Sequence, residues 1–247
     1  MTGLPIVIGH RGAKAIAPEN TLASFESACR AGAVMLELDV HLTADDVVVV
    51  IHDDTVDACT DGTGSVRAKT LAEVRELDAG SWFSPAYAGQ RVPTWDEVLE
   101  LVGRHPATGL LVEFKGVWTA EDAARVTSAI DAAGLGERSI VQSFYPETVK
   151  ALAEAAPHLR RGWLIERVHE PLLDICAQLG VMTCNPDVEL VMADPGLVGR
   201  LHEAGLQVMV WTANELAQWK VLVEAGVDAI ITDSPDRLAG WLAAQPA

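Results

Sequence analysis

Residues 201–235 read LHEAGLQVMVWTANELAQWKVLVEAGVDAIITDSP, a stretch in which helical and strand patterns alternate. The runs Gln207–Trp211 and Ala229–Thr232 are short, apolar and rich in β-branched residues, as buried strands are. The helical pattern of Glu215–Ala225 separates them, and a glycine stands shortly before each strand. Because glycine tolerates the left-handed conformation that closes a helix, the stretch predicts repeated helix-to-strand junctions in a parallel sheet.

The same unit recurs along the whole chain. Eight strands are predicted: Pro5–Gly9, Val34–Val40, Gly109–Lys115, Ser139–Phe144, Arg161–Ile165, Val181–Asn185, Gln207–Trp211 and Ala229–Thr232. Helices are predicted at Thr21–Ala31, Ala120–Ala133, Pro146–Ala155, Glu170–Leu179, Pro195–Ala204, Glu215–Ala225 and Pro235–Ala243. Eight strand–helix units in 247 residues favour an α/β fold of the (β/α)8 TIM-barrel type, with residues 1–247 as a single domain. An open dinucleotide-binding sheet is disfavoured, since no G-x-G-x-x-G pattern opens the first helix.

One segment interrupts the repeat after the second strand. Val47–Ile51 looks like an additional short strand, and about 53–90 then carries a short helical stretch, Ala68–Leu77, and the loop-like GSWFSPAYAGQ of Gly80–Gln90. An insertion at this point projects from one rim of the barrel. We therefore expect a small inserted subdomain at about 53–90.

Composition narrows the choice of partners and location. The net charge is −17, which disfavours nucleic acid and anionic membrane surfaces as partners. The four cysteines have the spacing of neither a zinc site nor a disulfide framework. No signal peptide is recognisable, and no apolar run reaches 18 residues. We expect a cytoplasmic protein without stable membrane association.

Three carboxylates occur at predicted strand ends, where (β/α)8 barrels place their active sites. Glu37 and Asp39 share one face of the second strand, and Glu113 lies on the third. Converging carboxylates repel one another unless a cation lies among them, and oxygen ligands suit Mg²⁺ or Ca²⁺. The alternative is an ion-pair network in which Arg11 and Lys115 neutralise the acids.

Two histidines and two cations complete the candidate site. His10 and His52 follow neighbouring strands and are the expected acid and base, because imidazole titrates near neutral pH. Arg11 and Lys115 are expected to bind a phosphate group beside the divalent cation. His41 shares the orientation of Glu37 and Asp39, but its place beyond the predicted strand end favours a loop role.

Aromatic and loop residues near these strand ends are less decisive. Trp211 ends a strand and is expected to form an apolar wall for the substrate. Trp82 and Trp118 fall in loops and serve equally well as packing residues. Asn20 or Thr21 is expected to cap the first helix.

These motifs resemble those of the glycerophosphodiester phosphodiesterases, specifically the short bacterial cytoplasmic type. The match runs nearly end to end through HRG (10–12), PENT (18–21), ELD (37–39), HD (52–53), GSWF (80–83), VPTWDEVL (92–99), EFK (113–115), SF (143–144), WT (211–212) and TDSP (232–235). The resemblance implies a barrel with a family insertion after the second strand and hydrolysis of a glycerophosphodiester to glycerol 3-phosphate and an alcohol.

The resemblance also assigns roles to residues. It implies one divalent cation held by Glu37, Asp39 and Glu113, catalysis by the two histidines, and phosphate binding by Arg11 and Lys115. Two positions depart from the family pattern. Asp46 stands where a turn glycine is usual, and Ala58 stands where an arginine is common, which bears on subdomain contacts and substrate preference.

The sequence leaves several alternatives open. A related phosphodiesterase acting on lysophospholipids or another phosphodiester fits the same fold, and a non-catalytic binding barrel is a different class of function. The choice between Mg²⁺ and Ca²⁺, the leaving alcohol and the oligomeric state are undetermined. So is the nucleophile, which is either the substrate's 2-hydroxyl, giving a cyclic phosphate, or water.

Overall fold

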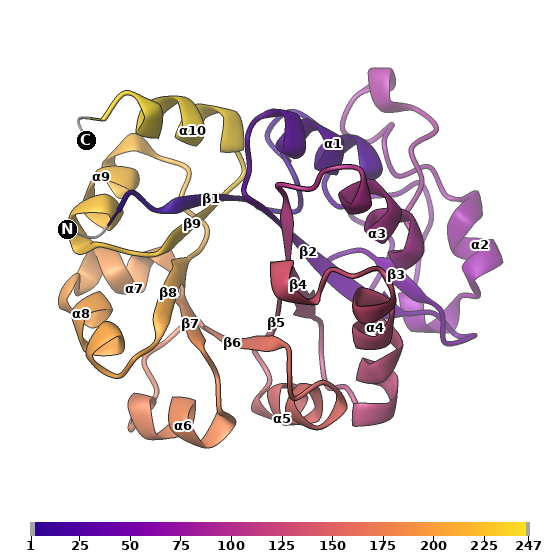
Figure 1. Ribbon diagram of the computed structural model, residues 1–247. Coiled ribbons are helices and arrows are strands. Elements are labelled where there is room, and N and C mark those ends of the chain that lie inside the picture. The colour runs from indigo at the N-terminus through magenta and orange to yellow at the C-terminus, as the bar shows by residue number, and fades with distance from the viewer. Residues whose placement is uncertain (1–2, 246–247) are drawn as a thin grey trace.

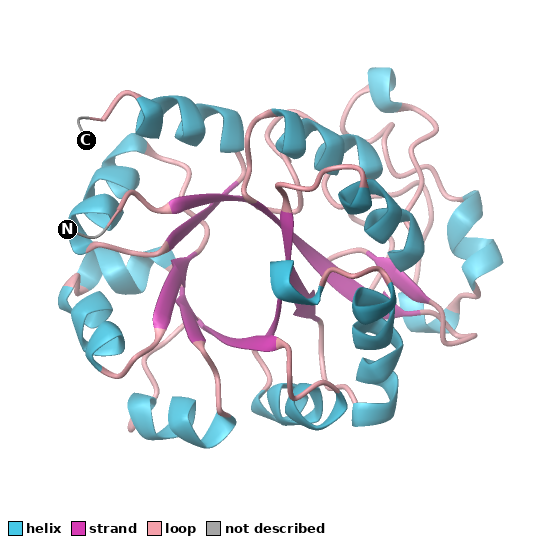
Figure 2. Cartoon of the chain, in the orientation of Figure 1, coloured by secondary structure: helices cyan, strands magenta, loops and turns pink. Residues whose placement is uncertain are grey.

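A computed structural model describes residues 3–245 and has a closed barrel of eight parallel strands at its centre (Figures 1 and 2). The barrel strands are β1 (Ile6–Gly9), β2 (Met35–Leu42), β4 (Gly109–Phe114), β5 (Ser139–Ser143), β6 (Arg160–Ile165), β7 (Thr183–Pro186), β8 (Gln207–Val210) and β9 (Ala229–Thr232). Closure comes from β1, which pairs with β9 on one side and β2 on the other. The predicted fold class is confirmed.

Helices surround the barrel on the outside (Figure 2). They are α1 (Leu22–Arg30), α3 (Trp95–Gly103), α4 (Ala120–Ala132), α5 (Pro146–Ala155), α6 (Leu172–Leu179), α7 (Val188–Ala193), α8 (Gly196–Glu203), α9 (Leu216–Ala225) and α10 (Pro235–Ala243). Glycines at the predicted junctions have positive φ, for example Gly180 (60°) and Gly226 (78°) at the ends of α6 and α9. The helices α3 and α7 were not predicted, although a capping box at Thr94 and Glu97 opens α3.

The second strand is longer than predicted. It continues to Leu42 because the antiparallel strand β3 (Val48–Val50) pairs with its end, placing His41 opposite Val49. The expectation of a loop position for His41 is therefore wrong. Pairing with a neighbouring strand, rather than local sequence, sets where this strand ends.

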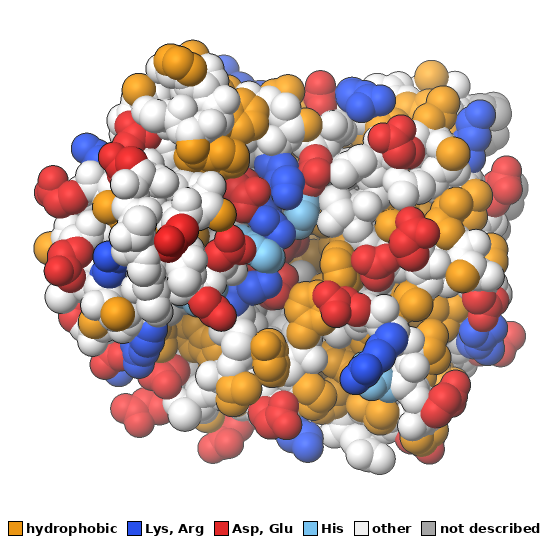
Figure 3. All heavy atoms as spheres, turned by 180° about the vertical axis from the view of Figure 1, so that it is seen from behind, with side chains coloured by type: hydrophobic (Ala, Val, Ile, Leu, Met, Phe, Trp, Pro, Cys, Tyr) orange, Lys and Arg blue, Asp and Glu red, His pale blue; other side chains and the backbone are white. Residues whose placement is uncertain are grey.

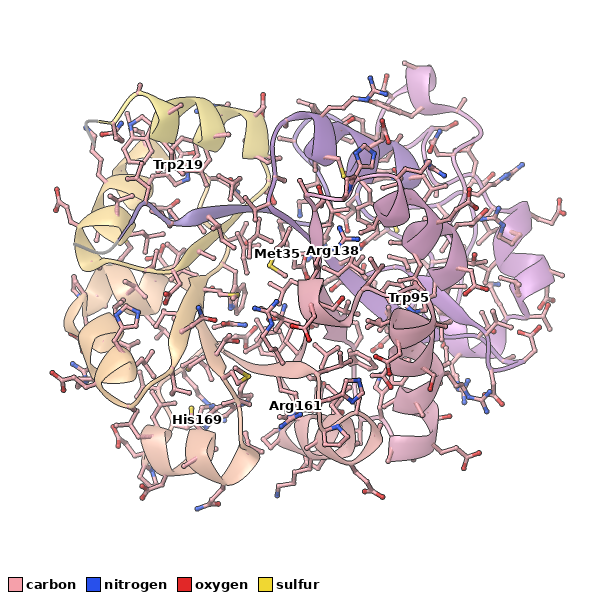
Figure 4. All side chains as sticks on the ribbon, in the orientation of Figure 1. Met35, Trp95, Arg138, Arg161, His169 and Trp219 are labelled. Atoms are coloured by element: carbon pink, nitrogen blue, oxygen red, sulfur yellow. The ribbon has the colours of Figure 1, made fainter. Side chains whose placement is uncertain are left out.

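Inside the barrel, the amino-terminal half is filled with apolar side chains. They form one cluster: Ile8, Met35, Leu111, Ile140, Met209, Ala229 and Ile231. Figure 4 shows Met35 inside the ring of strands on the β4 side, with Arg138 labelled next to it. The Arg138 Nη1 donates to the carbonyl oxygens of His105, Pro106 and Thr108, which ties together the loops at this end. This end of the barrel is closed by packing, so the open end is the opposite one.

The segment after β3 lies outside the ring of strands (Figure 1). It contains α2 (Leu71–Glu76) and two 3-10 turns, at Val66–Ala68 and Pro85–Tyr87. With the end of β3 it encloses its own small apolar cluster: Val49, Ile51, Val56, Cys59, Val66, Val74, Ala79 and Val92. Asp46 has a φ of 58°, so it takes the left-handed conformation for which the family turn usually has glycine.

Candidate active site

A cavity of about 650 Å³ opens at the carboxyl ends of the barrel strands. Seven of the eight predicted site residues line it: His10, Arg11, Glu37, His52, Glu113, Lys115 and Trp211. The eighth, Asp39, is 1% exposed and does not reach the cavity surface. Figure 3 views the molecule from behind and shows histidine, basic and acidic side chains gathered near the middle of that face.

The three predicted carboxylates form a single buried cluster. One oxygen from each of Glu37, Asp39 and Glu113 lies within 4.8 Å of the other two. Burial, together with repulsion by the neighbouring carboxylates, raises the pKa of Glu37 well above its usual range and that of Glu113 to about 7. The Oδ1 atom of Asp39 is buried without a hydrogen-bond partner. These oxygens are a fitting ligand set for a hard divalent cation.

The two predicted cations lie against this cluster. The Lys115 Nζ lies 2.8 Å from Glu113 Oε1, and the Arg11 Nε lies 3.5 Å from Asp39 Oδ2. Arg11 also bonds Glu19 at 2.7 Å. Burial alone would lower the pKa of Arg11 and of Lys115, but the surrounding carboxylates outweigh it and raise both.

The charges in and around this cluster do not cancel when every side chain is ionised. Glu19 is also 3.5 Å from Lys14. The cluster therefore has four carboxylates, those of Glu37, Asp39, Glu113 and Glu19, against three cations, Arg11, Lys115 and Lys14. A purely internal ion-pair network leaves one buried negative charge without compensation, which is costly in a protein interior. A proton on Glu37, whose pKa is raised, or an additional cation would restore the balance.

Each histidine that lines the cavity is held by a carboxylate. The His10 Nδ1 is 2.6 Å from Asp233 Oδ1, and the His52 Nδ1 is 2.6 Å from Asp53 Oδ1. A carboxylate accepts, so Nδ1 carries the proton in both rings and Nε2 is left for proton transfer. The His52 Nε2 accepts from Lys115 Nζ at 3.1 Å, in agreement with this tautomer. Burial lowers the pKa of His10 despite the opposing effect of Asp233.

His41 is not a member of the carboxylate cluster. It is 9% exposed within β2, and its Nε2 bonds the backbone oxygen of His52 at 3.1 Å. From this place in the strand, His41 holds the backbone of His52 through that hydrogen bond.

Two aromatic residues, Trp211 and Phe144, form one wall of the cavity. The rings of Trp211 and Phe144 pack edge to face, with their centroids 5.2 Å apart. The Trp211 Nε1 donates to the carbonyl oxygen of Asn185 at 2.8 Å. The other two tryptophans do not line the cavity: Trp118 is buried against Phe114, and Trp82 is half exposed in the insertion.

Several residues hold the site residues in place, a role that was not predicted for them from the sequence. Asp233 holds His10, Glu19 holds Arg11, and the Asn20 amide donates to Asp39 Oδ2 at 2.8 Å, while Thr21 alone caps α1. Asp233 lies in TDSP, and Glu19 and Asn20 lie in PENT. Membership of these motifs was the sequence signal that could have marked the three residues as part of the site, but only the fold shows which side chains they contact.

A cavity with fixed cations, clustered carboxylates and carboxylate-bound histidines combines anion binding with proton transfer. Fold and site together define a barrel hydrolase whose substrate is an anionic ester.

Comparison with known proteins narrows this class. Residues 10–237 match the model of the glycerophosphoryl diester phosphodiesterase family. A glycerophosphodiester phosphodiesterase of Caldanaerobacter subterraneus is 36% identical over 235 residues, which cover 94% of this chain and 96% of the relative.

Two solved structures are similar throughout. A phosphodiesterase of Oleispira antarctica, in complex with the product sn-glycerol-3-phosphate, has a TM-score of 0.92 at 28% identity and covers 98% of each chain. A glycerophosphodiester phosphodiesterase of Agrobacterium tumefaciens has a TM-score of 0.83 at 32% identity, covering 96% of this chain and all of that one (100%). The chain belongs to the glycerophosphodiester phosphodiesterase family, and it is an enzyme rather than a binding module.

Proposed function

We propose that this enzyme hydrolyses glycerophosphodiesters with the help of one divalent cation, Mg²⁺ or Ca²⁺, held by Glu37, Asp39 and Glu113. The observation that carries the proposal is the buried carboxylate cluster, in which Asp39 Oδ1 lacks any hydrogen-bond partner. A bound cation would supply Lewis-acid stabilisation of the negative charge that develops on the phosphoryl group.

Arg11 and Lys115 bind the phosphate in this proposal. Both line the cavity next to the carboxylates, and both are held in the charged form by them. A guanidinium presents a fork of donors to two phosphate oxygens, whereas an ammonium acts as a point charge. Together they orient the phosphorus and stabilise the added charge of the transition state.

His10 and His52 transfer the protons. One Nε2 removes the proton of the attacking hydroxyl as the new P–O bond forms. The other histidine carries a proton on Nε2 as well as on Nδ1 at this point, and it donates the Nε2 proton to the leaving alkoxide as the old P–O bond breaks. Their carboxylate partners, Asp233 and Asp53, hold each ring in the tautomer that leaves Nε2 toward the reaction. The attacking hydroxyl is either the 2-hydroxyl of the glycerol or that of water.

Glycerol 3-phosphate is the common product, and the leaving alcohol lies against the aromatic wall. The Oleispira relative was solved with sn-glycerol-3-phosphate, which supports the assignment of the retained half of the substrate. Trp211 and Phe144 offer an apolar surface to the other half.

A second candidate substrate is a lysophospholipid. Large apolar side chains are exposed in the loops after four barrel strands: Ile16, Val117, Tyr145 and Val168. These loops follow the carboxyl ends of β1, β4, β5 and β6, the end at which the cavity opens. An acyl chain would find apolar contacts there. Replacing Val117 by Ser should then reduce lysophosphatidylcholine turnover and leave glycerophosphocholine turnover unchanged.

The deciding experiment measures release of glycerol 3-phosphate from glycerophosphocholine by metal-stripped protein, before and after addition of Mg²⁺ or Ca²⁺. We expect release only with a cation, and a fall of about 10²-fold or more in turnover for His10→Ala and His52→Ala. Full activity of the stripped protein would refute the metal, and near-full activity of both variants would refute the histidines. A panel with glycerophosphoethanolamine, glycerophosphoinositol and a lysophospholipid identifies the leaving alcohol.

The cellular location and the domain organisation are also part of this proposal. All four cysteines (Cys29, Cys59, Cys176 and Cys184) are free thiols, which supports a reducing compartment such as the cytoplasm. No helix in residues 3–245 is long and apolar enough to cross a membrane. We propose that 1–247 acts as one catalytic domain with the segment at about 53–90 as its inserted subdomain.

A further inference from the structure

The loop between β1 and α1 has an unusual backbone. Arg11 and Asn20 have φ values of 51° and 53°, in the left-handed region that side chains other than glycine, asparagine and aspartate rarely adopt. The Asn20 N–H donates to the Arg11 carbonyl oxygen at 3.1 Å, which ties the two residues together. Such conformations persist where the surroundings impose them, and they concentrate at functional sites.

The left-handed turn brings the Asn20 side chain to Asp39. Its Nδ2 donates to Asp39 Oδ2 at 2.8 Å, and both residues are buried, at 3% and 1% exposed. Asp39 Oδ1 has no hydrogen-bond partner. The two oxygens of this carboxylate therefore differ: Oδ2 is hydrogen-bonded by the amide, whereas Oδ1 has only the Lys115 ammonium near it, 3.8 Å away, and makes no hydrogen bond.

From this geometry we infer that Asn20 is a positioning residue for the cation: by holding Oδ2 of Asp39, it presents Oδ1 to an ion bound with Glu37 and Glu113. The inference rests on the metal site of the proposed function and assigns it a residue outside the three ligands. Mutation of a residue that orients a metal ligand typically lowers metal affinity by about 10- to 100-fold.

Other neighbours do not perform this task. Helix capping does not explain Asn20, because Thr21 Oγ1 accepts from the Ser24 N–H. The Arg11 Nε is 3.5 Å from the same Asp39 oxygen and has no hydrogen bond there. In the proposed mechanism Arg11 also turns to the phosphate. Asn20 is thus the one donor, among the described residues, that makes a short bond to Asp39 Oδ2 independent of substrate.

The same loop also reaches a second ligand. The Arg11 N–H donates to Glu37 Oε2 at 3.0 Å. One loop therefore orients two of the three carboxylates, one through its backbone and one through the Asn20 side chain. Only the side-chain contact can be removed by substitution without altering the backbone donor.

The test is titration calorimetry of metal-stripped protein with Mg²⁺ and with Ca²⁺. Asn20→Gly removes the amide and suits the positive φ, and Asn20→Ser is a second variant that keeps a polar side chain too short to reach Asp39. We expect Kd for the cation to rise by about 10- to 100-fold in both variants. Turnover at saturating cation should return to within about threefold of the wild type, because the ligands and catalytic groups remain.

Thr21→Ala is the matched control, because it removes the cap of α1 one residue away and leaves the amide–carboxylate bond intact. Its Tm should fall while its Kd stays within about twofold of the wild type. An unchanged Kd in the folded Asn20 variants would overturn the inference, as would equal weakening in Thr21→Ala. If the wild type binds neither cation, the inference and the metal site both fall. Glycerol 3-phosphate release by the wild type reports separately on the proposed substrate.

Discussion

Replacement of Asp233 by Asn is predicted to slow catalysis by reversing the tautomer of His10. Asp233 accepts from His10 Nδ1 at 2.6 Å through one oxygen and from Asn214 Nδ2 at 2.9 Å through the other. The Asn214 amide cannot turn over, because its Oδ1 already accepts from the Thr232 hydroxyl and from the Asp233 N–H. An asparagine at position 233 must therefore direct its oxygen to Asn214 and its amide nitrogen to His10. Nδ1 of His10 then has to be the unprotonated nitrogen, and Nε2 carries the proton.

The size of the effect follows from the bond that is lost. A hydrogen bond to a charged group contributes about 1.5–3 kcal/mol. At about 1.4 kcal/mol for each factor of ten, its loss from the transition state lowers kcat by about 10- to 150-fold. Reversal of the tautomer adds to this loss, since the wrong nitrogen then faces the reaction. His10 and Asp233 are only 13% and 20% exposed, so water replaces the bond poorly.

The assay is steady-state release of glycerol 3-phosphate at saturating cation, with cation Kd measured in parallel. Asp228→Asn is the control, because Asp228 bonds His202 Nε2 at 2.9 Å at the start of β9, at the opposite end of the barrel. We expect a normal kcat for the control and a normal cation Kd for both variants. A kcat for Asp233→Asn within about threefold of the wild type would refute the orienting role of Asp233.

Further predictions concern the metal, the phosphate, the core and the insertion. Glu37→Gln should raise the calorimetric Kd for Mg²⁺ or Ca²⁺ by more than the roughly 10–100-fold expected for a residue that only orients a ligand; a smaller change would remove it from the ligand set. Lys115→Met should lower kcat/KM by about 10- to 150-fold through loss of a charged hydrogen bond, and an unchanged value would exclude phosphate binding by this ammonium. Phe25→Ala, in a fully buried position, should reduce the free energy of unfolding in urea by about 3–5 kcal/mol, with a loss below 1 kcal/mol contradicting the packing described. The Asp78 carboxylate accepts hydrogen bonds from the backbone N–H groups of Ser81, Gly89 and Gly80. These bonds, of which the one from Ser81 has the largest effect, lower the pKa of Asp78 below its usual range. The stabilisation of this loop by the ionised carboxylate is therefore complete above the ordinary pKa of about 3.9 and is lost as the pH falls further. Protection of the backbone amides of 80–90 against hydrogen exchange should drop in acid for the wild type and change less for Asp78→Asn.

The repeat of strand, helix and glycine was sufficient to predict the barrel. Strand spacing and the glycine junctions are local properties, and they placed all eight barrel strands within about two residues of their observed bounds. The prediction was wrong where a long-range pairing takes part. The end of the second strand and the position of His41 depend on β3, and α7 is a helix of six residues with little periodicity to detect.

What the sequence by itself determined is the set of residues gathered at one end of the barrel. In a parallel barrel all strands end on the same side, so residues at strand ends had to converge, and seven of the eight predicted site residues line one cavity. Only the tertiary structure decided which atoms meet. It put Asp233 against His10 across 223 positions of sequence and Asn20 against one oxygen of Asp39. Strand-end position follows from local pattern, whereas hydrogen-bond partners depend on barrel closure and loop conformation, which bring together residues that share no local signal.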